Sequence, residues 1–151
     1  MKQWRKGGYT LDNIIKFELE SIPVNEKIAR QLISAVLVDL NPTIEEICDI
    51  KTAVSEAVTN SIIHGYKNTK GKIYITVTVK DNDISIEIND FGVGIEDVER
   101  AREPLYTSEP EMERSGMGFT VMESFMDELD VISEKGFGTK IIMRKRITAY
   151  E

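Results

Sequence analysis

The chain has 151 residues, which suits one domain, and its hydrophobic fraction of 41% can supply a core. Its net charge of -7 argues against direct binding to nucleic acid, which usually needs a basic face. No apolar run reaches the roughly 18 to 20 residues that cross a bilayer, and none follows the basic N-terminus as in a signal peptide. These features predict a cytoplasmic protein without membrane contact. The single cysteine, Cys48, allows no internal disulfide and is expected in the core.

Apolar periodicity and turn residues divide the chain into a flexible leader over 1–12 and one domain over 13–151. Thr43, with Glu46 three residues later, reads as a capping box, and Gly65 as the stop of the same helix. The predicted elements, in chain order, are a strand over 14–20, helices over 25–40 and 43–64, strands over 72–80 and 84–89 joined by a turn over 81–83, a short helix over 96–102, a mobile loop over 103–115, a helix over 117–126, and strands over 129–132 and 139–147.

This order is not the regular alternation of strand and helix that a doubly wound sheet requires. Hairpin strands with long helices favour an α+β fold, a two-layer sandwich in which helices cover one face of a mixed β-sheet.

Two glycine clusters and one polar helix face carry chemical signals. Asp90-Phe91-Gly92-Val93-Gly94 follows a strand, where a carboxylate can accept a bond from an exocyclic amine and glycines allow close approach. Ser115-Gly116-Met117-Gly118 opens a helix, where exposed N–H groups suit phosphate oxygens. In isolation, a plain β-turn and a flexible loop before a helix cap explain these clusters equally well.

The polar face belongs to the second long helix. Glu56 and Asn60 are four residues apart and therefore share a face. A carboxamide oxygen is a suitable ligand for Mg²⁺ that bridges phosphates, and a carboxylate can accept the proton of an attacking hydroxyl. A surface glutamate with a helix-terminal asparagine is the alternative reading of this pair.

The order of these signals is more specific than any one of them. Glu-x-x-x-Asn, Asp-x-Gly-x-Gly, Gly-x-Gly and the later Gly138-Thr139 resemble the N, G1 and G2 boxes of the GHKL ATPase superfamily over residues 14–147. No P-loop motif is present. Within the superfamily, the segments 54–66, 104–110, 113–119 and 122–127 resemble the anti-sigma F factor family of serine-protein kinases.

That resemblance implies the GHKL (Bergerat) ATP-binding fold, ATP or ADP with Mg²⁺ as cofactors, and an ATP-dependent protein serine kinase. It implies roles position by position: Glu56 as the base, Arg114 at the γ-phosphate, Asn60 on Mg²⁺, and the remaining nucleotide contacts from Asp90, Gly92, Gly94, Ser115, Gly116, Met117, Gly118 and Thr139.

The resemblance also implies partners. They are a sporulation-type sigma factor held inactive, an anti-anti-sigma protein phosphorylated on serine, and a second copy of the chain in a homodimer. Arg30 matches a sigma-contacting arginine of the family. Two alternatives stay open: a stress-response anti-sigma kinase of the same superfamily, which the wording of segment 104–119 disfavours, and a nucleotide-gated sequestering module without phosphate transfer, which has no use for Glu56 as a base.

Overall fold

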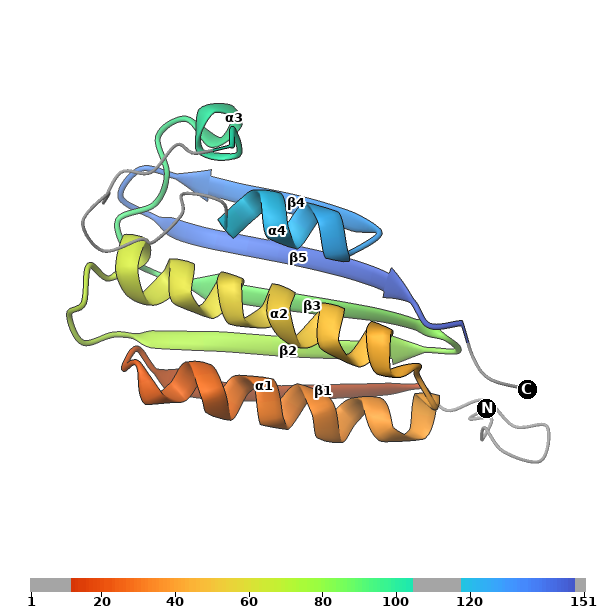
Figure 1. Ribbon diagram of the computed structural model, residues 1–151. Helices are drawn as coiled ribbons and strands as arrows, with labels where there is room; N and C mark the ends of the chain where they lie inside the picture. Colours follow the sequence, from red (N-terminus) through yellow and green to blue (C-terminus); the bar gives the residue numbers. More distant parts are fainter. Residues whose placement is uncertain (1–11, 105–117, 149–151) are drawn as a thin grey trace.

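The computed structural model describes residues 12–104 and 118–148. The expectations for the leader, for most of the 103–115 loop, and for Arg114, Ser115, Gly116 and Met117 lie outside the described residues. The described part has two layers, with helices α1, α2 and α4 on one face of a twisted sheet (Figure 1). This arrangement confirms the predicted α+β class.

The sheet has five strands in the order β1-β2-β3-β5-β4, and every neighbouring pair is antiparallel. The prediction that the sheet is mixed is therefore wrong, because no neighbouring strands of the described sheet are parallel. β3 and β4 run in the same direction, but β5 returns through a hairpin from β4 and lies between them. The bounds are β1 Asn13–Glu20, β2 Lys72–Lys80, β3 Asp83–Asp90, β4 Glu128–Glu134 and β5 Gly138–Arg146.

Alternation along the strands builds the core. In β2 and β3 every second residue is buried against the helices while the others face away, which is the period of a half-buried strand. Ile73, Ile75 and Val77 are at most 1% exposed, and each such side chain stabilises the fold by about 1.5–3 kcal/mol. The β2–β3 turn is shorter than predicted, because Lys80 already pairs with Asp83 across it.

The helices are α1 (Val24–Leu37), continued by a 3-10 turn (Val38–Leu40), then α2 (Ile44–Asn60), α3 (Val98–Ala101) and α4 (Gly118–Phe125). α1 packs against α2, and α2 packs against α4. The predicted α2 is longer than the α-helical part, because a π-helical turn (Ser61–Gly65) completes it.

The capping box at the start of α2 is confirmed. The Thr43 hydroxyl accepts from the Glu46 N–H (3.1 Å), and Glu46 Oε1 accepts from the Thr43 N–H (2.9 Å). The prediction that Cys48 is buried is wrong, because its side chain is exposed. Cys48 precedes the fully buried Ile50 by two residues, about 200° around the helix, so it turns away from the core.

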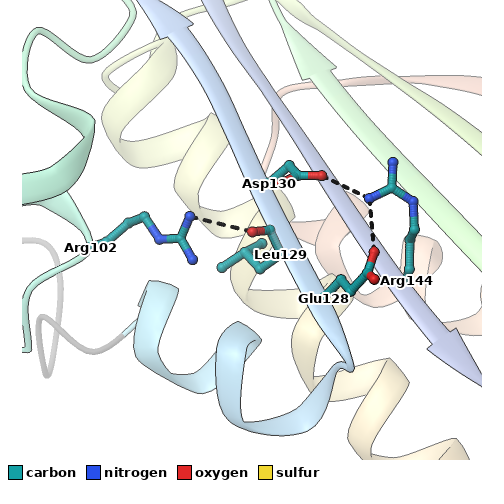
Figure 2. A network of polar contacts seen from close by, with 5 residues as sticks. All are labelled: Arg102, Glu128, Leu129, Asp130 and Arg144. Atoms are coloured by element: carbon teal, nitrogen blue, oxygen red, sulfur yellow. Dashed lines mark hydrogen bonds and ion pairs between the residues drawn. The ribbon is translucent and has the colours of Figure 1, made fainter.

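Polar contacts join β4, the edge strand of the sheet, to β5 on one side and to the segment after α3 on the other (Figure 2). Arg144 on β5 donates to Asp130 Oδ2 (2.7 Å) and Glu128 Oε2 (3.3 Å) on the exposed face. Arg102, just after α3, donates to the Leu129 carbonyl (3.4 Å) and forms an ion pair with Glu123 of α4. The Arg102 contacts fix the segment after β3 against β4 and α4, and so help to position one wall of the site.

Candidate nucleotide-binding site

An open cavity of about 1600 Å³ lies between α2, the loop that follows β3, and the first turn of α4. Glu56 and Asn60 both line it from α2, one helical turn apart. The loop contributes Val93 and Gly94, and α4 contributes Gly118. The structure therefore brings the polar helix face, part of the first glycine cluster and the end of the second one to a single cavity.

Asp90 ends β3 on the helix side of the sheet and is 1% exposed. Its carboxylate accepts from the Ser61 hydroxyl (2.8 Å), the Gly92 N–H (3.0 Å) and the backbone of Thr139. Burial raises the pKa of Asp90 above its usual range, and these three donors oppose that rise. Because a carboxylate offers about four acceptor positions, one remains for a further donor.

Asp90 and Thr139 do not themselves line the cavity. They are paired across β3 and β5, and Thr139 is 3% exposed. The residues that line the cavity beside them are Ile62 and Ile63 of the π-helical turn and Val93 of the loop. Asp90 and Thr139 therefore lie behind the lining of the cavity.

Close backbone contact explains the glycines around Asp90. A Cβ at Gly92 would lie 2.1 Å from the Gly65 carbonyl oxygen, and a Cβ at Gly65 would lie 2.9 Å from the Asp90 carboxylate. Gly94 has φ +75° and a Cβ there would lie 2.0 Å from the Glu134 carbonyl oxygen. Gly92 and Gly94 thus let the loop lie directly on the π-helical turn after α2 and on the β4–β5 hairpin.

A second set of residues, which the sequence analysis missed, lines the cavity from both α1 and α2. Glu26 and Ser55 both line it, and the Ser55 hydroxyl donates to Glu26 Oε1. Arg30 Nη2 donates to Glu26 Oε2 (3.3 Å), while its Nε lies 2.9 Å from Oε1 without hydrogen-bond geometry. The predicted partner-binding Arg30 is therefore paired within α1, beside the cavity.

Ser61 and Ser133, which hold Asp90 and Thr139, were also missed. A signal for Ser61 was present, because it directly follows Asn60 and lies about 100° further around the helix, toward the sheet. Ser133 gave no signal, because its role depends on strand register with Thr139. His64, interpreted as a structural residue, also lines the cavity.

The site fits Mg²⁺ only as a companion of phosphates. Among the residues that the structure describes, no group of three or more His, Cys, Asp or Glu side chains could hold a metal ion. Asn60 lines the cavity, and its carboxamide oxygen is of the hard type that would suit Mg²⁺. Mg²⁺ keeps several waters and commonly binds through one or two protein ligands plus substrate phosphates, so a single carboxamide is compatible with it.

The sequence and the fold match a known class. The family described as "Histidine kinase-like ATPase domain" matches residues 19–145. A structure of the RsbU and RsbW domains of Rv1364c from Mycobacterium tuberculosis superposes with a TM-score of 0.63 at 18% identity, covering 89% of this chain and 32% of that chain. The present chain spans about a third of that protein, and the likeness supports the fold alone.

Similarity to curated proteins is closer. The chain is 57% identical to an anti-sigma F factor of Clostridium perfringens (strain SM101), covering 91% of this chain and 99% of the relative. It is 53% identical to the anti-sigma F factor of Clostridium acetobutylicum, covering 93% and 99%, and 52% identical to that of Shouchella clausii, covering 90% and 94%. The chain therefore belongs to the anti-sigma F factor family, within the histidine kinase-like ATPases.

Proposed function

We propose that this protein binds and inhibits a sporulation-type sigma factor and, as an ATP-dependent serine kinase, phosphorylates an anti-anti-sigma protein that opposes it. Family membership supports an anti-sigma factor with a kinase-like ATPase domain. The observation that carries the phosphate transfer is the shared cavity of Glu56 and Asn60, opposite the loop that begins at Asp90. A protein that only bound nucleotide would gain nothing from a carboxylate placed there.

In the proposed reaction, the adenine amino group donates to Asp90, and the triphosphate extends along the cavity toward Asn60 and the start of α4. Mg²⁺, when bound to Asn60 and the phosphates, would neutralise charge on the phosphate oxygens. Gly118 lies at the N-terminus of α4, and with Ser115, Gly116 and Met117 its N–H groups would hold phosphate oxygens. Gly92, Gly94 and Thr139 would shape the adenine pocket.

The chemical step follows from these positions. The carboxylate of Glu56 takes the proton of a substrate serine, whose oxygen forms a bond to the γ-phosphorus as the bond to the β–γ bridging oxygen breaks. ADP leaves with the electrons of that bond. Arg114 stabilises the charge on the transferring group, as a cation does in other phosphoryl transfers.

Partner binding would use the surface beside the same cavity. Arg30 would contact the sigma factor, and because it is paired with Glu26 at the cavity, a partner that takes Arg30 would also alter that wall. The homodimer is proposed from the family resemblance. No helix of the described residues is long and apolar enough to cross a membrane.

The direct test uses the purified full chain, γ-labelled ATP with Mg²⁺, and the anti-anti-sigma protein encoded by the same genome. The expected result is label on one serine of the acceptor, together with inhibition of transcription by the sigma factor. If ATP binds but no label is transferred while inhibition persists, the protein is a nucleotide-gated sequestering module. If transfer occurs only to a stress-response antagonist, the sporulation assignment is wrong.

A further inference from the structure

The hydroxyl of Ser133 on β4 makes three polar contacts, one of them to Thr139, which pairs with Asp90 across β5 and β3. Ser133 Oγ on β4 lies 2.9 Å from the Gly138 carbonyl oxygen and 2.8 Å from Thr139 Oγ1, and it accepts the Ile95 N–H over 2.7 Å. Ser133 and Thr139 are paired across β4 and β5, so this contact follows from strand register.

Counting the protons of the two hydroxyl groups identifies the donor in each contact. A serine hydroxyl has one proton and two acceptor positions. If Ser133 donates to the Gly138 carbonyl, its two acceptor positions take the Ile95 N–H and the Thr139 hydroxyl, and all three contacts are hydrogen bonds. If Ser133 instead donates to Thr139, its contact with the Gly138 carbonyl has no proton. Because the first arrangement makes three hydrogen bonds and the second only two, the first is favoured.

In the first arrangement, the Thr139 hydroxyl donates its only proton to Ser133. Thr139 Oγ1 can then act toward a ligand only as an acceptor. Its neighbour across the sheet, the Asp90 carboxylate, is likewise an acceptor and already holds three protein donors. Both side chains at this end of the site thus require hydrogen-bond donors from whatever base reaches them.

We propose that Ser133 is a positioning residue for nucleotide selection: by holding the Thr139 proton away from the ligand, it makes the site favour a 6-aminopurine over a 6-oxopurine. This inference rests on the proposed binding of ATP at Asp90. The 6-amino group of adenine donates two protons, whereas the 6-oxo group of hypoxanthine or guanine places an acceptor against two acceptors.

The test compares ATP with ITP, which differ at the purine 6-position and in the proton that ITP carries on N1. Calorimetry on the full chain, without a protein acceptor, would measure both dissociation constants. We expect wild-type protein to prefer ATP by about 100-fold or more. In Ser133→Ala, the Thr139 hydroxyl can rotate and donate to the 6-oxo group, so the preference falls at least about tenfold, mainly through tighter ITP binding.

Two variants provide controls. Ser133→Thr keeps the hydroxyl and should keep the wild-type preference. Ser85→Ala makes the same change on β3, where the side chain faces away from the helices, and should change neither constant. Should Ser133→Ala fail to fold, Thr139→Val serves in its place: losing that acceptor weakens ATP binding and removes one unfavourable contact with the 6-oxo group of ITP, so the ATP-to-ITP preference should fall.

The outcomes separate the two proposals. An unchanged ATP-to-ITP ratio in Ser133→Ala or in Thr139→Val, or equal weakening of both nucleotides in Ser133→Ala, overturns the role of Ser133 alone. Equal binding of ATP and ITP by wild type overturns it too, while leaving the kinase proposal intact. Absence of ATP binding by wild type overturns the proposed function itself.

Discussion

The hydroxyl of Ser61 donates to Oδ2 of Asp90 over 2.8 Å, which joins the last turn of the α2 region to the end of β3. Both side chains are at most 1% exposed. A buried carboxylate held by neutral donors is costly to ionise, so Asp90 opposes stability at neutral pH in the absence of ligand. Retaining such a group makes sense where a ligand completes its hydrogen bonding.

The first prediction concerns Asp90→Asn and the pH dependence of stability. Because burial raises the folded-state pKa of Asp90 above 3.8, its favourable contribution is fully present below 3.8 and is lost as pH rises through the raised folded value. The free energy of unfolding of wild type relative to Asp90→Asn should therefore decline across that window. Urea denaturation at several pH values measures it, and a relative stability that rises with pH would refute the assignment.

The second prediction separates two glycines of the site region. In Gly92→Ala, the Cβ meets the Gly65 backbone oxygen at 2.1 Å, so the loop must shift away from the π-helical turn. Nucleotide affinity should fall by about tenfold or more, and thermal stability should fall with it. Gly136→Ala is the control, because φ is +88° but nothing lies within 4 Å of the added Cβ. It should cost only about 1 kcal/mol of stability. If calorimetry and thermal melting showed equal losses of affinity and stability in Gly92→Ala and Gly136→Ala, this account would be contradicted.

The third prediction concerns Glu46, which links the start of α2 to Thr148. Burial opposes ionisation of Glu46, but four hydrogen bonds from Thr148 and Thr43 outweigh it and lower its pKa below 4.5. This contribution to stability is present above pH 4.5 and is lost as pH falls through the lowered folded value.

Glu46→Gln should therefore cost about 2 kcal/mol at pH 7, and less as the pH falls below 4.5. Denaturant titrations at pH 7 and pH 3.5 measure both values. Glu45→Gln, an exposed carboxylate in the same helical turn, is the matched control. A cost that grows on acidification would contradict the hydrogen-bonding account.

The fourth prediction tests the proposed base. Glu56→Gln keeps the size of the side chain and its place in the cavity, but removes the group that accepts the serine proton. ATP affinity should stay within about threefold of wild type, whereas phosphate transfer should fall by about 10²–10⁴. Single-turnover transfer with labelled ATP measures the step. Normal transfer by this variant would assign the base elsewhere, and Glu45→Gln again provides the control.

The sequence predicted the described elements well where local signals were strong. Thr43 and Glu46 predicted the start of α2, and alternating isoleucine and valine predicted β2 and β3. Antiparallel pairing throughout was not predicted, because the place of β5 between β3 and β4 depends on long-range pairing. Cys48 was misplaced because residue type alone does not give its angle around α2.

For the site, spacing alone predicted that Glu56 and Asn60 share a face, and both line the cavity. The supporting hydroxyls of Ser61 and Ser133 were not predicted. The partner of a serine hydroxyl depends on strand register and helix geometry, which the sequence alone does not show. The same holds for Glu26, whose contact with Ser55 joins residues 29 positions apart. The roles given to Arg114, Ser115, Gly116 and Met117 stay predictions.

The π-helical turn at Ser61–Gly65 has a mechanical consequence. Its wider ring presents the Gly65 carbonyl to the Val93 N–H (2.8 Å), and the Val93 carbonyl in turn accepts from the Gly136 N–H (2.6 Å). Main-chain hydrogen bonds thus join the π-helical turn, the loop and the hairpin, and no side chain takes part in either bond. A substitution can break this connection only by displacing the backbone, as the added Cβ of Gly92→Ala would.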